Sequence, residues 1–133
     1  MAKDQIRRLV TAIGWTSIGL GLFDAVMAKR LARGVGITSP TAFRLAAARE
    51  IATGAGAVAA PTLAWPIAAR LAGDVVDLAT LGATAGTKDG SKRRNAAIGV
   101  GIVALVTIVD AFALGKLRGW DAATSRKSSG AAA

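Results

Sequence analysis

Two long stretches of this chain are almost free of charge, and they constrain its fold more than any motif does. Leu9 to Ala28 is twenty residues with one charged side chain, Asp24, and Asn95 to Gly115 is twenty-one residues with one, Asp110. A helix needs about 20 predominantly apolar residues to cross the hydrocarbon core of a bilayer. The second stretch is apolar all round the helix, which leaves no face for water. Each stretch therefore predicts a transmembrane helix.

The composition agrees with a membrane protein and excludes several kinds of chemistry. The 133 residues are 53% hydrophobic, and 17 Lys+Arg against 8 Asp+Glu give a formal charge of +9. A chain this apolar, with a mean hydropathy of +0.46, is not a disordered nucleic-acid-binding tail. It has no Cys or His, which excludes disulfides and imidazole catalysis and removes the usual ligands of zinc, haem and iron–sulfur clusters. No catalytic motif or Gly-rich phosphate loop is present, so we do not expect an enzyme.

The middle of the chain predicts two more helices less directly, because it is Ala-rich but carries six charged side chains. Pro61 and Pro66 flank Trp65 there, and two prolines five residues apart favour a tight turn that starts a new helix. The predicted fold is therefore all-α. It is a four-transmembrane-helix bundle over residues 1–124, with helices at approximately 5–31, 41–60, 62–85 and 92–118.

The remaining segments are predicted to be connections and a tail. Lys29 to Pro40 and Gly86 to Arg94 are basic, Gly-containing stretches typical of solvated loops, and Ser91 is a potential cap of the last helix. Residues 125–133 consist of Ser, Gly and Ala with two basic residues, and we expect a flexible C-terminal tail.

Two other interpretations of the helices stay open at this point. Ile51 to Ala69 is uncharged and could form a single proline-kinked span, which would give three crossings. A soluble four-helix bundle is the second alternative, although the apolar surface of the last stretch opposes it.

The charges at the span ends leave the orientation in the membrane undetermined. With four spans, seven Lys or Arg side chains lie on the side of the two termini and eight lie on the opposite side. Cytoplasmic loops normally hold the excess of Lys and Arg, so a near-equal split favours neither orientation and leaves an antiparallel dimer open. We expect these basic rims to contact anionic lipid headgroups rather than nucleic acid.

Small residues at four-residue spacing predict where the helices pack closely. Such stripes let helix backbones approach when no hydrophobic effect drives membrane helices together. The stripes are Ser17 and Gly21; Ala52, Gly56 and Ala60; Ala64, Ala68 and Ala72; and Ala97 and Gly101.

Seven charged residues inside the predicted spans form a candidate polar network. They are Asp24, Arg49, Glu50, Arg70, Asp74, Asp77 and Asp110. A charge at the centre of a span costs about 2.5 to 3.5 kcal/mol even on the lenient insertion scale, so these groups need partners. A rise of about 1.5 Å per residue places Arg70 level with Asp110, and Arg49 level with Asp77. We predict both salt bridges.

The same spacing places Arg70, Asp74 and Asp77 on one stripe of the third helix, which we expect to face the bundle interior. Two interpretations of the network compete. In the first it only fixes helix register. In the second it lines a polar cavity for a proton, a cation or the polar head of a lipid-soluble molecule, with the acids neutralised by protonation or by a cation.

One combination of these residues resembles a known family. Arg49-Glu50-Ile51 with Gly54 and Gly56, then Trp65, the segment from Arg70 to Leu78 and finally Asp110 are similar to the small DoxX-like four-helix membrane proteins of high-GC bacteria. The resemblance spans about Ile6 to Leu117 and implies a four-span architecture in the bacterial cytoplasmic membrane. Similar segments occur alone or next to polyketide-cyclase/dehydrase-like domains, and such a domain is not part of this chain.

The functional expectation is an integral membrane protein acting as an accessory or structural subunit, within a larger membrane complex or a homo-oligomer. A small proton- or cation-coupled transporter that uses Glu50, Asp74 and Asp77 is the main alternative. An oxidoreductase accessory that handles a quinone-like, lipid-soluble molecule is a third. The sequence identifies no cofactor.

Overall fold

The computed structural model describes residues 1–86 and 88–130, and over these residues the chain is all-helical, with four helices and no strand. The helices are α1 (Lys3–Val35), α2 (Thr41–Ala59), α3 (Trp65–Ala85) and α4 (Gly90–Gly130). The all-α prediction is confirmed. Both outer helices are longer than their apolar stretches indicated.

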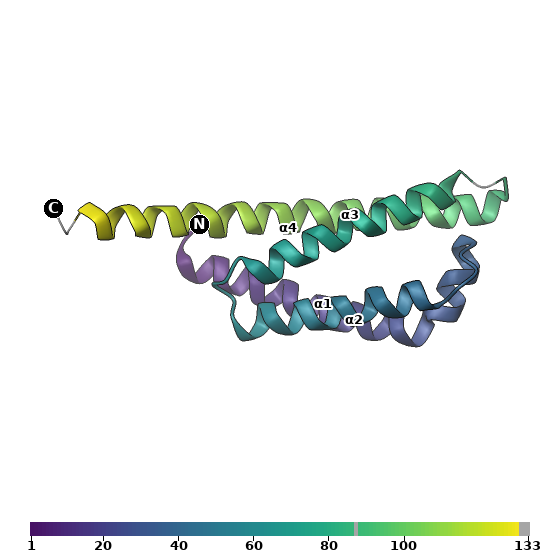
Figure 1. Ribbon diagram of the computed structural model, residues 1–133, viewed down its shortest axis with the longest axis horizontal. Helices are drawn as coiled ribbons and strands as arrows, with labels where there is room; N and C mark the ends of the chain where they lie inside the picture. The colour runs from purple at the N-terminus through teal and green to yellow at the C-terminus, as the bar shows by residue number, and fades with distance from the viewer. Residues whose placement is uncertain (87, 131–133) are drawn as a thin grey trace.

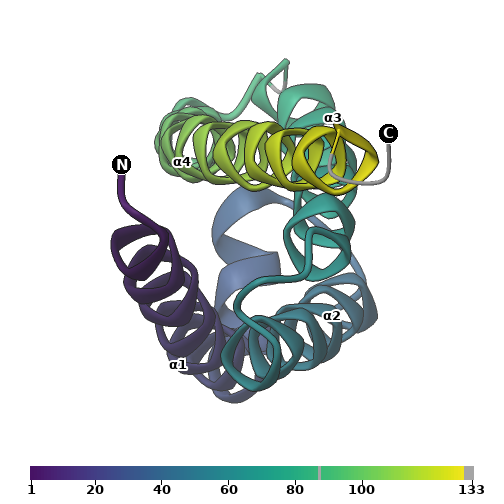
Figure 2. The same ribbon diagram turned by 90° about the vertical axis from the view of Figure 1, so that its left-hand side faces the viewer.

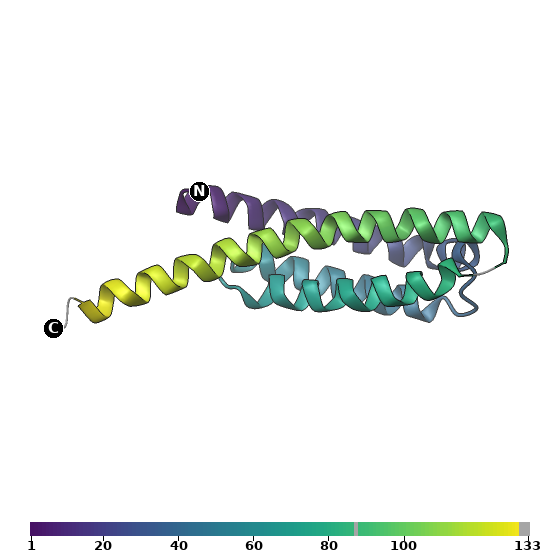
Figure 3. The same cartoon turned by 90° about the horizontal axis from the view of Figure 1, so that it is seen from above.

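Two antiparallel hairpins make up the molecule, α1 with α2 and α3 with α4 (Figure 1). The turn between α2 and α3 lies at the same end as the amino terminus, and the two other connections lie together at the opposite end (Figure 3). Seen along the bundle, α1 and α2 form one layer, and α3 and α4 lie on the other side (Figure 2). The chain order thus brings residues from all four helices to each level of the bundle.

The connection between α1 and α2 is shorter than predicted. α1 continues through the basic residues to Val35 and ends at Gly36, which has φ 81°. Glycine adopts this left-handed conformation at little cost, and the Ile37 N–H then bonds back to the Ala32 carbonyl at 2.8 Å. The prediction that the loop begins at Lys29 is therefore wrong, because nothing before Gly36 stops the helix.

A true turn separates α2 from α3. α2 ends at Ala59, residues 60–64 are not helical, and α3 begins at Trp65 with Pro66 in its first turn. Proline suits that position because the first N–H groups of a helix have no partner inside it. The hairpin prediction is confirmed, and the single kinked span over Ile51 to Ala69 is wrong.

α4 begins and ends differently from the prediction. Asp89, not Ser91, caps it, because the Asp89 carboxylate accepts the backbone N–H groups of Ser91 and Lys92 at 3.1 and 3.2 Å. The helix runs to Gly130 instead of ending near residue 118, since no proline interrupts it. Residues 125–130 of the predicted tail are thus helical, residues 131–133 lie outside the described residues, and the tail's flexibility stays a prediction.

Large apolar side chains are not confined to the interior of the bundle, and several polar side chains are buried in it. Large apolar side chains are exposed on every helix, among them Leu22 of α1, Leu45 of α2, Val75 of α3 and Leu105 of α4, at 54%, 67%, 59% and 65%. The buried polar and charged residues are Ser17, Thr53, Arg70, Asp74 and Asp110. In proteins folded in water, charged residues are seldom fully buried unless they are paired.

Two of the helices are long and apolar enough to cross a membrane, α1 and the segment Gly90–Trp120 of α4. Only 22% and 17% of the residues in their most apolar windows are buried in the bundle. These segments are therefore not the buried core helices of a globular protein. The two inner helices, α2 and α3, do not pass the same test of length and hydropathy.

An apolar core fills the end of the bundle that holds the amino terminus and the turn between α2 and α3. Every helix contributes to it: Ile6, Val10 and Ile13 of α1, Ala57 of α2, Ile67 of α3, and Ala113, Leu114 and Leu117 of α4. The seven charged residues of the predicted network lie beyond this core, toward the opposite end. The core therefore closes one side of the polar network.

The small-residue stripes are confirmed on α1, confirmed in part on α2 and α3, and wrong on α4. Gly56 of α2 packs against Trp65, and Ala64 and Ala68 of α3 pack against the apolar core, whereas Ala72 is exposed. Ser17 and Gly21 are buried against α2, together with Gly14. On α2, however, the buried small residues are Ala47, Gly54 and Ala57, whereas Ala52 is exposed. On α4 both Ala97 and Gly101 are exposed. In a chain rich in Ala and Gly such spacings also arise by chance, so spacing alone does not select the packed face.

Candidate functional site

One guanidinium group joins all four helices. Arg70 of α3 is 4% exposed, and its Nε donates to Asp110 Oδ2 of α4 at 2.8 Å. Its Nη1 donates to the Ser17 hydroxyl of α1 and lies 3.7 Å from Glu50 Oε1 of α2. The predicted bridge to Asp110 is confirmed. Glu50, to which the sequence assigned no partner, is the second acid beside Arg70.

Ser17 binds Arg70 at a point where α1 and α2 pack closely. Its hydroxyl donates to the Glu50 carbonyl at 3.0 Å while accepting the Arg70 N–H. A Cβ added at Gly14 would lie 2.7 Å from the Gly54 carbonyl oxygen, closer than real Cβ atoms come. The two glycines thus bring the backbones near enough for one short hydroxyl to bridge them.

A second ion pair joins α2 to α3. Arg49 Nη2 lies 2.7 Å from Asp77 Oδ2, and Nη1 lies 3.5 Å from Oδ1, so the pair is bidentate. Each side chain is 27% exposed. Gly73 makes room for it, because a Cβ there would overlap the Arg49 guanidinium. The predicted bridge between Arg49 and Asp77 is confirmed.

Two acids of the network are only partly satisfied. Asp74 is 2% exposed, and the Thr107 hydroxyl donates to its Oδ2 at 3.3 Å while also bonding to the Val103 carbonyl at 2.7 Å. Asp110 Oδ1 is buried with no hydrogen-bond partner among the described residues. Buried polar atoms normally have a partner, so Asp110 Oδ1 is an exception, and Asp74 has one donor that it shares with a backbone carbonyl.

The charges do not balance within the network. Two arginines, Arg49 and Arg70, face five acids: Asp24, Glu50, Asp74, Asp77 and Asp110. With every group ionised the set carries a net charge of −3. Within the described residues no three His, Cys, Asp or Glu side chains gather into a cluster that could hold a metal ion. The excess negative charge is therefore left to protons or to a counter-ion that needs no such cluster of ligands.

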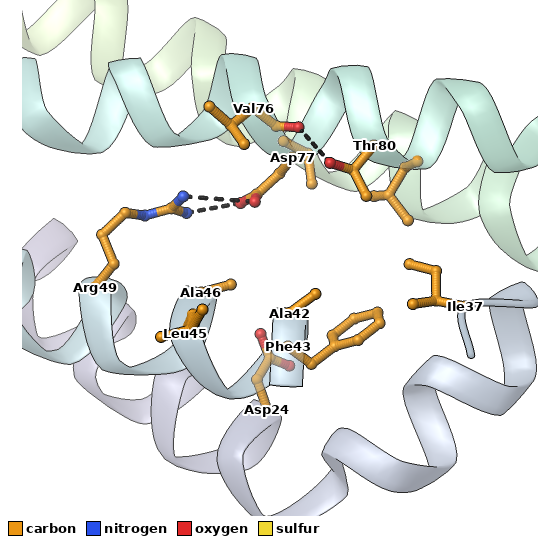
Figure 4. Close-up of a pocket in the computed structure, with 12 residues that line it drawn as sticks. Asp24, Ile37, Ala42, Phe43, Leu45, Ala46, Arg49, Val76, Asp77 and Thr80 are labelled. Carbon is orange, nitrogen blue, oxygen red and sulfur yellow. Dashed lines mark hydrogen bonds and ion pairs between the residues drawn. The ribbon is translucent and has the colours of Figure 1, made fainter. Parts of the chain in front are cut away.

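A cleft of about 430 Å³ adjoins the pair formed by Arg49 and Asp77. It lies between the two hairpins, with the first half of α2 on one side and α3 on the other (Figure 4). Asp24 of α1 and Ile37 of the loop between α1 and α2 also line the cleft. Asp24 thus lies beside the ion pair of Arg49 and Asp77, across the same cleft.

The seven residues predicted for the network thus lie in one region of the bundle. Asp24 and Asp77 line the cleft, and Asp110 lies on the side of the apolar core. Ser17 and Thr107 belong to the network as well. Sequence reasoning treated Ser17 only as a small residue and passed over Thr107. The available signal was a hydroxyl placed inside an otherwise apolar stretch.

Comparison with known proteins does not assign this arrangement to a family. No protein-family description, curated protein or solved structure matches the chain.

Proposed function

We propose that this chain is an integral membrane protein whose four helices all cross the bilayer, and that it serves as an accessory or structural subunit of a membrane assembly. The observation that carries the proposal is Arg70, which contacts one residue on each of the other three helices. In hydrocarbon no water is present to solvate a guanidinium, so its ion pairs and hydrogen bonds hold the helices together.

The exteriors of α2 and α3 support four spans rather than two. At about 1.5 Å per residue, the 19 residues of α2 and the 21 residues of α3 extend about 28 Å and about 31 Å, against a hydrocarbon thickness of about 30 Å. Their hydropathy is low because of Arg49, Glu50, Arg70, Asp74 and Asp77, and these side chains point into the bundle. The large residues exposed on these helices, such as Leu45 and Val75, are apolar, except for the charged Arg44 in the first turn of α2.

The basic residues at the two ends of the bundle would contact anionic lipid headgroups or a protein partner. The DoxX-like features of the sequence support placing the chain in the bacterial cytoplasmic membrane. The function proposed is non-enzymatic, because ion pairs between the helices, such as those of Arg70 with Asp110 and of Arg49 with Asp77, stabilise a bundle without supplying a reaction.

Single cysteines test the four-span arrangement, because the chain has no native Cys to react. Thr38→Cys and Lys88→Cys lie in the two loops at one end of the bundle, and Thr62→Cys lies in the turn at the other end. In sealed vesicles of one orientation, a membrane-impermeant maleimide is expected to label the first two from one side and the third only from the other. Labelling of all three from the same side contradicts the proposal.

A small proton-coupled transporter is the second candidate, and the unsatisfied atom of Asp110 together with the weakly bonded Asp74 favours it. A carrier needs a buried carboxyl that can exchange its proton, and these two are the most deeply buried acids of the network. Proteoliposomes that hold a pH-sensitive dye test it with the wild type and Asp74→Asn. A proton flux present in the first and lost in the second supports a carrier, whereas no flux in either supports the accessory role.

A further inference from the structure

We infer that the cleft between α2 and α3 binds a lipophilic organic monocation, such as a bulky phosphonium or quaternary ammonium compound. The inference rests on the proposed position of the bundle in the bilayer, because it takes the ligand from the lipid. It adds a ligand class to a protein that the ion-pair network alone would make purely structural.

The walls of the cleft suit an apolar body. Most of the lining residues have aliphatic or aromatic side chains: Ile37, Phe43, Leu45, Val76, Leu81 and Val103. The volume of about 430 Å³ lies within the range of about 300 to 1,000 Å³ that is typical of small-molecule sites. Phe43 also lines the cleft, and aromatic rings attract cations.

The charge of the cleft selects the sign of the ligand. Asp24, Arg49 and Asp77 are its three ionisable residues. Arg49 and Asp77 neutralise each other in a bidentate pair, while Asp24 has no hydrogen-bond or ion-pair partner among the described residues. With both carboxyls ionised the cleft has a net charge of −1, which one monovalent cation would neutralise.

The position of the cleft gives the ligand a route through lipid. Leu45 and Val76 line the cleft and are 67% and 61% exposed, so they form part of its outer rim. With the bundle in a bilayer this rim meets hydrocarbon. A hydrophilic cation would have to leave water to reach Asp24, whereas a lipophilic cation already partitions into the membrane.

Two ions of equal shape and opposite charge test the inference. Tetraphenylphosphonium and tetraphenylborate are titrated by equilibrium dialysis into the wild-type protein in detergent, with protein-free micelles as the blank. We expect saturable binding of one tetraphenylphosphonium per chain and no saturable binding of tetraphenylborate. Equal binding of both ions, or none of tetraphenylphosphonium, overturns the inference.

Two variants locate the site. Asp24→Asn removes the unpaired acid and is expected to weaken tetraphenylphosphonium binding on the order of tenfold, which corresponds to about 1.4 kcal/mol. Its control is Asp4→Asn, which removes an acid from the same helix outside the cleft. Ala46→Leu fills the cleft and should weaken binding, while Ala48→Leu on the exposed face of α2 should not. Unchanged affinity in Asp24→Asn or in Ala46→Leu contradicts the assignment.

Failure of this inference is distinguishable from failure of the proposed function. The same preparation is tested for resistance to alkaline carbonate extraction from membranes. A protein that resists extraction but binds no tetraphenylphosphonium keeps its place in the bilayer and loses only the cation site. A protein released by carbonate loses the proposed function, whatever the dialysis shows.

Discussion

Arg70 and Arg49 face different demands, although both are arginines at inward positions. Arg70 is nearly inaccessible and has partners on three helices, whereas Arg49 has a single partner and is partly exposed. Breaking a buried ion pair by removing one member costs about 3 to 5 kcal/mol, because the other charge stays buried. The loss is smaller where solvent or headgroups can reach the group that remains.

Arg70→Gln is therefore expected to lower the melting temperature in detergent more than Asp77→Asn does. We expect a loss of about 3 to 5 kcal/mol for the first and about 1 to 3 kcal/mol for the second. Helix unfolding followed by circular dichroism measures both, with Asp4→Asn as the control. An Asp77→Asn protein that melts like the wild type but has lost a substrate-dependent proton flux would instead support the transporter.

Gly73→Ala is predicted to break the pair of Arg49 and Asp77 without touching either residue. The new Cβ occupies the place of the guanidinium, so Arg49 must move away from the carboxylate. The melting temperature should fall about as far as in Asp77→Asn, and the double variant should show little further loss. Gly82→Ala on the same helix is the control, since nothing lies within 4 Å of its added Cβ, and its helix propensity should raise stability by up to about 1 kcal/mol. Full additivity in the double variant contradicts this explanation.

At the scale of the helices, the contact between α1 and α2 depends on glycines that have no side chain to hold the backbones apart. Gly14→Ala places a Cβ 2.7 Å from the Gly54 carbonyl oxygen and 2.8 Å from Val58 Cγ2, so the helices must separate. Overpacking of this kind costs about 1 to 3 kcal/mol. The melting temperature in detergent should fall, whereas Gly19→Ala, whose Cβ meets nothing within 4 Å, should leave it equal or higher. Equal effects of the two changes would show that the close approach is unimportant.

The start of α4 gives the bundle a pH-sensitive end. Hydrogen bonds from the Ser91 side chain and the Lys92 backbone hold the pKa of Asp89 below its ordinary value of 3.8. A lowered pKa means that the folded state favours the carboxylate, so the cap is fully present above pH 3.8 and is lost as the pH falls through the lower folded value. Amide exchange at Ser91 and Lys92 should accelerate below that pH and should be fast at neutral pH in Asp89→Ala. An exchange rate that does not depend on pH, after correction for intrinsic chemistry, contradicts the cap.

The predictable part of the site is the part that depends on depth alone. The rise per residue of a helix is constant, so Arg70 with Asp110, and Arg49 with Asp77, could be paired from their distances to the span ends. Which residue faces which neighbour also depends on helix rotation, and sequence does not fix rotation in a chain where most faces are apolar. For this reason the Glu50 contact with Arg70 was missed, and the packed face of α2 was assigned to Ala52 instead of Gly54. The cleft is harder still, since it depends on how far two hairpins separate.

At the scale of the whole molecule, the fold consists of successive levels along one axis. Apolar packing fills the end with the turn between α2 and α3, the Arg70 contacts follow, and the pair of Arg49 and Asp77 lies beyond them beside the cleft. The four helices and the hairpin turn could be predicted because charge-free lengths and prolines are local signals. The lengths of α1 and α4 could not, because basic residues form helix as readily in solvent as apolar residues do in lipid.

The proposed four-span arrangement requires hydrocarbon, and not water, to surround the exposed apolar residues of all four helices. Spin labels on single cysteines test it directly in reconstituted bilayers, with one site near the middle of each helix. The sites are Leu22→Cys, Ala52→Cys, Val75→Cys and Leu105→Cys, all of which replace exposed residues. Collisions with dissolved oxygen should exceed those with a water-soluble nickel chelate at every site. Labels on α2 and α3 that collide more with the nickel chelate than with oxygen would contradict this arrangement.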